Sequence, residues 1–197
     1  MKILDKVCLV KRATLLSDGS PETDSSHSFK LAWLLMMIYP YLRHEYNYTR
    51  LLELALVHDI AEAETGDYPK AVQRAHPEIK KIKDAQEAES IQRYAHILPL
   101  DLGVRILELW QEYEDKKTPE ARLVKALDKI DANLQANQYK NGDVRYWMEC
   151  ADGKEYLTIN AEKKNEVAIL NEPIVEELEN AVIELSLENL RKCGIKV

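Results

Sequence analysis

The stretch LALVHDIAEAETGD (residues 54–67) is the most informative part of this chain. It places a histidine and an aspartate, His58 and Asp59, side by side at the end of an apolar helix. Burying such a pair without a partner costs several kcal/mol. A divalent cation removes that cost, because it takes a neutral imidazole nitrogen and a carboxylate oxygen as ligands at once. With His27 before the stretch and Asp128 after it, the pattern H…HD…D indicates a metal-dependent hydrolase.

Apolar residues at helical spacing predict an all-α fold around this stretch. The chain has only six glycines in 197 residues, which favours helices over many tight turns. Asp24 or Ser25 is expected to cap the helix that precedes the His-Asp pair in the chain. Thr49 is expected to cap the helix that contains the pair. A polar loop is expected at residues 17–24. The predicted helices cover residues 2–10, 25–43, 49–65, 77–97, 101–115, 119–139 and 172–192.

A strand-like piece interrupts this helical pattern late in the chain. Residues 146–157 contain Asp152-Gly153 between two β-prone runs, which predicts a small hairpin or an ordered loop as an insertion at residues 141–158. The length suits one domain over residues 1–197. Its motifs fall within residues 10–140, and residues 141–197 hold the hairpin or loop and a final helix.

Composition limits the possible partners and the compartment. A net charge of −7 disfavours nucleic-acid duplexes and anionic membranes but not a small phosphorylated substrate, because a metal ion reverses the local field. The three cysteines are scattered and show no C-x-x-C spacing, which favours a reduced, cytoplasmic protein. Charges break the N-terminus too early for a signal peptide, and no apolar run is long enough for a membrane span.

Each candidate ligand also has an ordinary structural explanation. His27, taken alone, fits an exposed first-turn histidine, and His58 fits a core histidine. Asp128 and Asp131 could pair with Lys125 or Lys129 on a solvated face; for Asp131 this explanation and a role in the site are equally supported. The remaining histidines, His44, His76 and His96, are expected on the surface. The charged run at residues 80–89 is expected to be a solvated helix face.

Three strings together resemble a known family. They are Ser26-His27-Ser28, then residues 55–62 with Thr65-Gly66-Asp67, and then residues 124–129. Their order and spacing resemble the HD-domain metal-dependent phosphohydrolases, and within them the branch of the 5′-deoxynucleotidases. Two positions depart from that branch: Ser26 replaces a residue that is commonly acidic, and Ala13 replaces a residue that is often aromatic.

The resemblance implies a role for each residue of the site. His27, His58, Asp59 and Asp128 would bind one divalent metal ion, for which mixed nitrogen and oxygen ligands favour Mn²⁺, Co²⁺, Fe²⁺ or Mg²⁺. It also implies a catalytic or water-orienting role for Glu62, which shares a helix face with His58 at a spacing of four residues. Asp67 would face the sugar or the attacking water, Arg12 would reach the substrate phosphate, and the protein would form a homodimer.

The function expected from these residues is release of phosphate from (deoxy)ribonucleoside 5′-monophosphates. One alternative is hydrolysis of another phosphate ester or of a larger nucleotide. A second alternative is an HD protein that senses a nucleotide and has no activity. The presence of all four predicted metal ligands and of Glu62 argues against this second alternative.

Overall fold

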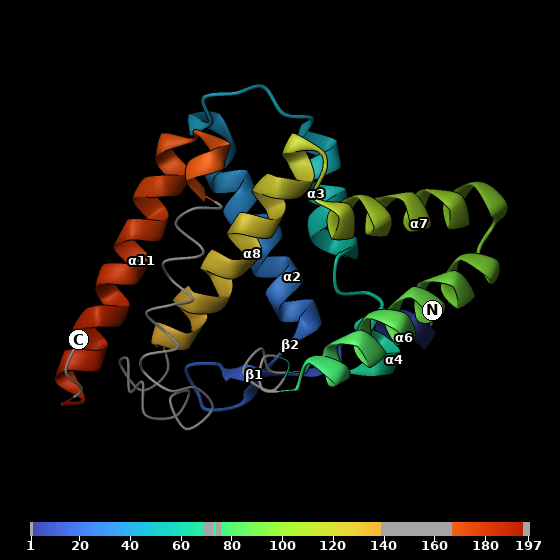
Figure 1. The fold of residues 1–197 in the computed structure, drawn as a ribbon, viewed down its shortest axis with the longest axis horizontal. Helices are drawn as coiled ribbons and strands as arrows, with labels where there is room; N and C mark the ends of the chain where they lie inside the picture. The colour runs from blue at the N-terminus through green and yellow to red at the C-terminus, as the bar shows by residue number, and fades with distance from the viewer. Residues whose placement is uncertain (1, 69–72, 74–75, 139–166, 195–197) are drawn as a thin grey trace.

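Helices form most of the chain in the computed structural model, which describes residues 2–68, 73, 76–138 and 167–194 (Figure 1). The predicted all-α class is confirmed, and the helices expected after residue 76 match the structure to within two residues. The described elements are α1 (Lys2–Val7), β1 (Lys11–Leu15), β2 (Pro21–Thr23), α2 (Asp24–Ile38), η1 (Tyr39–Tyr41), α3 (Tyr48–Val57), α4 (Glu62–Thr65), α6 (Pro77–His96), α7 (Leu100–Asp115), α8 (Pro119–Gln138) and α11 (Pro173–Lys192).

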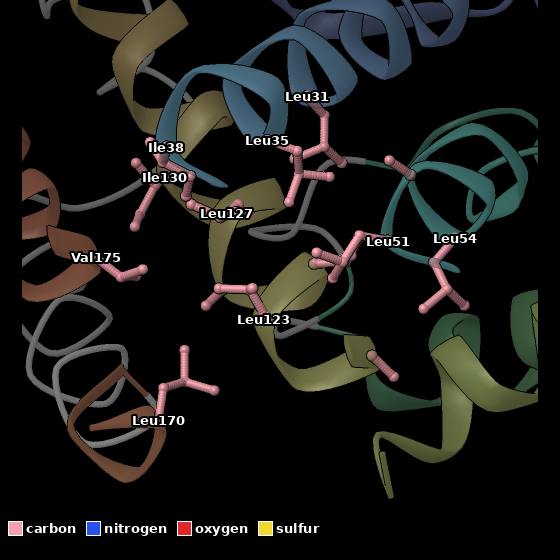
Figure 2. Packing of buried hydrophobic residues seen from close by; sticks show 14 of the residues in the cluster. Leu31, Leu35, Ile38, Leu51, Leu54, Leu123, Leu127, Ile130, Leu170 and Val175 are labelled. Carbon is pink, nitrogen blue, oxygen red and sulfur yellow. The ribbon is translucent and has the colours of Figure 1, made fainter. Parts of the chain in front are cut away.

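The apolar core lies where α2, α3 and α8 pack against one another. Leu35 of α2, Leu51 of α3 and Leu127 of α8 are fully buried in it (Figure 2). Full burial of one such side chain contributes about 1.5–3 kcal/mol. Val175 and Val182 join α11 to the same cluster, so the C-terminal helix shares a core with the segment that carries the sequence motifs. None of the described helices combines the length and apolar composition that a membrane crossing requires.

Helices α6 and α7 form an arm that extends from this bundle (Figure 1). They pack closely near their junction, where a Cβ atom at Gly103 would collide with the backbone carbonyl of Ala95. Glycine is therefore the residue that allows this approach. The arm brings the middle of α6 against α4, next to the His-Asp stretch.

The polar loop expected at residues 17–24 is shorter in the structure, because residues 16–20 form the turn of a hairpin and residues 21–23 form its second strand. Strands β1 and β2 are antiparallel, and Lys11 pairs with Thr23. The Asp18 carboxylate accepts a hydrogen bond from the Ser20 backbone N–H at 2.9 Å and closes the turn. Strands of five and three residues are too short to show an alternating pattern from which they could be predicted. The hairpin expected at residues 141–158 lies outside the described residues.

Two predicted helix caps are wrong. Thr23, not Asp24 or Ser25, caps α2, and its side chain accepts from the Ser26 N–H. Asp24 is instead buried inside the first turn, because its carboxylate faces Arg12. Asn47, not Thr49, caps α3 by accepting from the Arg50 N–H.

The helix expected over residues 49–65 is broken at the His-Asp pair. Helix α3 ends at Val57, and α4 begins at Glu62. Between them the Ile60 N–H donates to the Val57 carbonyl and the Glu62 N–H donates to the Asp59 carbonyl, an i to i+3 pattern of tight turns. The ideal helical face assumed for residues 58–62 therefore does not exist. Gly66 ends α4, as expected, with a φ of 77°.

Candidate metal centre

Two buried histidines from different helices face each other. His27 lies in the first turns of α2, and His58 follows the last residue of α3. Their ring centroids are 5.3 Å apart. His27, expected to be exposed when taken alone, is fully buried. The structure therefore contradicts that explanation for His27.

Both histidines use Nδ1 in a hydrogen bond and direct Nε2 to the space between them. His27 Nδ1 lies 2.8 Å from Asp131 Oδ2, and His58 Nδ1 lies 2.9 Å from the Ala55 carbonyl oxygen. Since both partners are acceptors, each Nδ1 donates its proton. For His58 this selects the tautomer with a lone pair on Nε2, as is usual for a metal-ligating histidine. His27 differs, because its Nε2 also lies beside a carboxylate oxygen, Asp128 Oδ1.

Asp128 completes a set of three ligand atoms with these histidines. The ligand atoms of His27, His58 and Asp128 all lie within 4.8 Å of one another. The Oδ1 of Asp128 is 3.0 Å from His27 Nε2, and its Oδ2 accepts from the Tyr113 hydroxyl at 2.8 Å. Lys125 also pairs with Asp128, at 3.1 Å, so the expected lysine contact exists beside the centre rather than on a solvated face.

Asp131 is a positioning partner of His27 and not a surface residue. It is 5% exposed and contacts His27 through Nδ1, on the side away from His58. Burial alone would lower the pKa of His27, but the hydrogen bonds to Asp128 and Asp131 raise it to about 10. The two carboxylates thus make His27 strongly basic.

Asp59 joins the centre from the turn between α3 and α4. Its Oδ2 is 2.9 Å from His58 Nε2, although that nitrogen makes no well-aligned hydrogen bond within the described part of the chain. The same Oδ2 accepts from the Arg12 guanidinium at 2.9 Å. Asp59 also belongs to a second group of oxygens within 4.8 Å, which includes Asp24 and Glu62. It therefore connects the histidine side of the site to an acidic side.

Arg12 lies on β1, at the acidic side of the site. Its guanidinium is 3.3 Å from Asp24 and 3.6 Å from Glu22, in addition to Asp59. Burial would lower the pKa of Arg12, but the neighbouring carboxylates outweigh it and hold that pKa above its usual value. The pKa of Asp24 rises to about 7, because burial and the charge of Asp59 outweigh Arg12. Sequence reasoning missed Glu22 because the hairpin that carries it was not predicted, and it assigned Asp24 to a helix cap rather than to the site.

Glu62 contacts the centre on one side and a buried lysine on the other. Its Oε1 accepts from Lys83 Nζ at 2.7 Å, and its Oε2 has no hydrogen-bond partner among the described residues. Burial and the charge of Asp59 outweigh Lys83 and raise the pKa of Glu62 to about 9. The expectation of a solvated face at residues 80–89 is therefore wrong for Lys83 and Glu87, which are both buried.

Asp67 lines a surface cavity of about 370 Å³ beside Glu62. The volume is at the small end of the range for ligand pockets. The charge of Asp67 contributes to the raised pKa values of Asp24 and Glu62, so Asp67 lies within electrostatic reach of the acidic side. Besides Glu62 and Asp67, the cavity is lined by Lys6, Leu9, Val10, Lys11, Ala63 and Gly66.

The three remaining histidines, His44, His76 and His96, are exposed, as expected.

The donor set in the centre fits a divalent metal ion on structural grounds. Two imidazole Nε2 atoms and carboxylate oxygens converge in a buried place, and His58 Nε2 lacks a well-aligned partner there. Buried polar atoms without a partner are rare, because each costs free energy.

Comparison with known proteins agrees with this geometry. A model of the HD domain family matches residues 4–168. The chain belongs to the HD domain family. It is similar to the 5′-deoxynucleotidase HDDC2 of Dictyostelium discoideum, with 34% identity over 147 residues that cover 71% of this chain and 75% of that protein. The family resemblance predicted from the three strings is thus confirmed.

The human 5′-deoxynucleotidase HDDC2 is 36% identical over 121 residues, or 61% of this chain. The matched part spans 56% of the human protein's own length. Among solved structures, a predicted metal-dependent phosphohydrolase from Magnetospirillum magnetotacticum superposes with a TM-score of 0.71 and 24% identity. That match covers 100% of this chain and 94% of the other. The PH0347 protein of Pyrococcus horikoshii gives a TM-score of 0.59 at 27% identity, covering 90% and 98% of the two chains.

Proposed function

We propose that this protein is a metal-dependent phosphohydrolase that releases phosphate from (deoxy)ribonucleoside 5′-monophosphates. One divalent ion would bind His27, His58, Asp59 and Asp128. The observation that carries the proposal is the pair of buried histidines whose Nδ1 atoms are both engaged as donors, with His27 Nε2 beside Asp128 and His58 Nε2 beside Asp59. The names of the relatives, 5′-deoxynucleotidases, support the substrate class.

A divalent ion in this place would polarise a phosphate oxygen and lower the pKa of water. The residues around it have complementary tasks. Arg12 offers a cation that suits a phosphate dianion and is already turned toward Asp59. Glu62 has a raised pKa and an Oε2 atom without a hydrogen-bond partner among the described residues, so it can take a proton from water or give one to the leaving alcohol.

Asp67 is proposed to select the sugar. A carboxylate at the rim of the cavity beside Glu62 can accept a hydrogen bond from a 3′-hydroxyl. A fit without room for a 2′-hydroxyl would reject ribonucleotides, and such rejection by a clash is worth more than the loss of a weak contact. We expect deoxyribonucleoside 5′-monophosphates to react faster than their ribose counterparts, with little discrimination among bases.

The metal ligands are tested by metal content. Purified wild type and His58→Ala would be loaded with Mn²⁺, desalted and compared by elemental analysis. Wild type should retain about one ion per chain and the variant much less, because His58 is one of only four proposed ligands. His44→Ala is a matched control, since His44 is exposed. Equal metal content in wild type and His58→Ala would contradict the proposed site.

The activity is tested by phosphate release with added Mn²⁺, Co²⁺ or Mg²⁺. The substrates are dAMP, AMP, dTMP, a 3′-monophosphate and dATP, compared by kcat/KM. Release from 5′-monophosphates supports the proposal, and a preference for dATP would favour the larger-nucleotide alternative. Nucleotide binding without turnover would favour the sensing alternative. Equal values for dAMP and AMP would remove the sugar selection but leave the phosphohydrolase.

We also propose a homodimer. Helix α2 carries a second apolar face, opposite the core, on which Phe29, Trp33, Met36 and Met37 are each about half exposed or more. A helix that is apolar on both faces is usually covered, and contiguous exposed apolar surface marks an interaction site. Light scattering at micromolar concentration should give twice the chain mass, and Trp33→Ser should lower it. A monomeric wild type would contradict this proposal.

A cytoplasmic location is proposed from the composition. The three cysteines show no disulfide spacing, and Cys8 is exposed. Exposed thiols persist in a reducing compartment. A fluorescent fusion, followed by microscopy, tests the location.

A further inference from the structure

A lysine is buried behind the proposed catalytic glutamate. Lys83 of α6 is 6% exposed, and its Nζ lies 2.7 Å from Glu62 Oε1 and 2.6 Å from Glu87 Oε1. Burial would lower the pKa of Lys83, but Glu62 and Glu87 outweigh it and raise that pKa above its usual value. Lys83 is therefore a charged ammonium enclosed between two carboxylates.

Stability alone does not account for this arrangement. A buried ion pair seldom stabilises a fold more than apolar residues of similar volume would. The neighbouring position holds such a residue, Ile82, yet Ile82 points outward and is 57% exposed. Helix α6 thus directs a cation inward and an isoleucine into solvent, the reverse of the usual amphipathic pattern.

The contact has a directional effect on Glu62. Helix α4 has four residues and follows a run of tight turns, so it gives Glu62 little rigidity of its own. Lys83 extends from a twenty-residue helix that is packed against both α4 and α7. Because Lys83 binds Oε1, the other oxygen, Oε2, is left without a hydrogen-bond partner in the described chain. The Glu62 carboxylate as a whole faces the acidic side of the site, since one of its oxygens lies within 4.8 Å of oxygens of Asp24 and Asp59.

We propose that Lys83 is a positioning residue for Glu62. Its ammonium holds Oε1 and thereby keeps Oε2 directed at the reaction site, and Glu87 fixes the ammonium from behind. This inference rests on the proposed function of Glu62 as acid or base. It concerns the orientation of the carboxylate, so it predicts an effect on turnover rather than on metal binding or substrate affinity.

The test compares Lys83→Met, Lys83→Arg and Lys80→Met with wild type, all loaded with Mn²⁺, on dAMP. We expect Lys83→Met to lower kcat by about tenfold to a hundredfold, with KM and metal content near those of wild type. Lys83→Arg keeps a cation and should recover part of the loss. Lys80 is the matched control, because it lies on the exposed side of the same helix, where it pairs with Asp84. Lys80→Met should behave as wild type.

A double-mutant cycle separates positioning from an independent role. Glu62→Gln alone should lower kcat by roughly 10²–10⁴. If Lys83 acts through Glu62, adding Lys83→Met to Glu62→Gln should lower kcat little further. The inference would be overturned if the two substitutions lowered kcat by independent factors that multiply in the double variant. An unchanged kcat in Lys83→Met would overturn it as well. Should Lys83→Met not fold, the same cycle is run with Glu87→Gln, which keeps the lysine but removes the charge behind it.

The result also distinguishes this inference from the proposed function. A wild type that releases phosphate, together with a fully active Lys83→Met, overturns the positioning role alone. A wild type that retains Mn²⁺ but releases no phosphate from any monophosphate overturns both. A reduced kcat at constant KM and metal content, with partial recovery in Lys83→Arg, supports the inference.

Discussion

Helices α8 and α6 both have 20 residues, but their N-terminal parts bury opposite kinds of side chain. Helix α8 turns Leu123, Leu127 and Ile130 into the core, in the order that apolar spacing predicts. Helix α6 turns Lys83 and Glu87 inward and leaves Ile82 in solvent. The side chains that a helix buries therefore depend on what it packs against. Where α8 meets apolar neighbours it buries apolar side chains, and where α6 meets Glu62 it buries a lysine.

The largest expected effect concerns the apolar face of α8. Leu127→Ala should reduce the free energy of unfolding by roughly 2–5 kcal/mol, because Leu127 is fully buried and its removal leaves a cavity. Chemical denaturation of the metal-free protein measures the change. Leu56→Ala is the control, since Leu56 is 59% exposed, and it should shift stability by about 0.5 kcal/mol or less. Equal losses in the two variants would contradict the described core.

A smaller effect, on metal affinity, is expected at the buried Asp131 of α8. Asp131→Asn keeps an acceptor for His27 Nδ1 but removes the negative charge that makes the ring basic. We expect affinity for Mn²⁺ to fall by roughly ten- to a hundredfold, as for other partners of metal-bound histidines. Competition with a chelator of known affinity measures it. Asp115→Asn, at an exposed site on α7, is the control, and unaltered affinity in Asp131→Asn would show that Asp131 does not tune the histidine.

The smallest effect is expected on the outer face of α6. Ile82→Lys should change the free energy of unfolding by about 0.5 kcal/mol or less, because the side chain is exposed and lysine is a good helix former. Thermal unfolding followed by circular dichroism measures it. A loss near that of Leu127→Ala would mean that Ile82 is buried in the protein in solution, and that the comparison between the two helices is wrong.

The motif residues were predictable because their chemistry is unusual in an apolar setting. The string around His58 and Asp59, with His27 and Asp128, indicated a metal centre, and the structure brings the ligand atoms of three of these residues within 4.8 Å. The long helices followed from apolar spacing together with the prolines at their ends, as the agreement at α6, α7 and α8 shows. Short elements did not, because the hairpin β1–β2 has too few residues to give an alternating pattern.

The long helices, the family and the residue types of the site could be predicted from sequence, since these depend on local spacing and side-chain chemistry. Tertiary structure decided which groups become partners. Asp131 binds His27 across 104 residues of chain, and Lys83 reaches Glu62 only because α6 packs on α4. A lysine or an aspartate is the same letter in the sequence whether it lies on a solvated face or in a buried pair. Its role therefore depends on which residue the folded chain places opposite it.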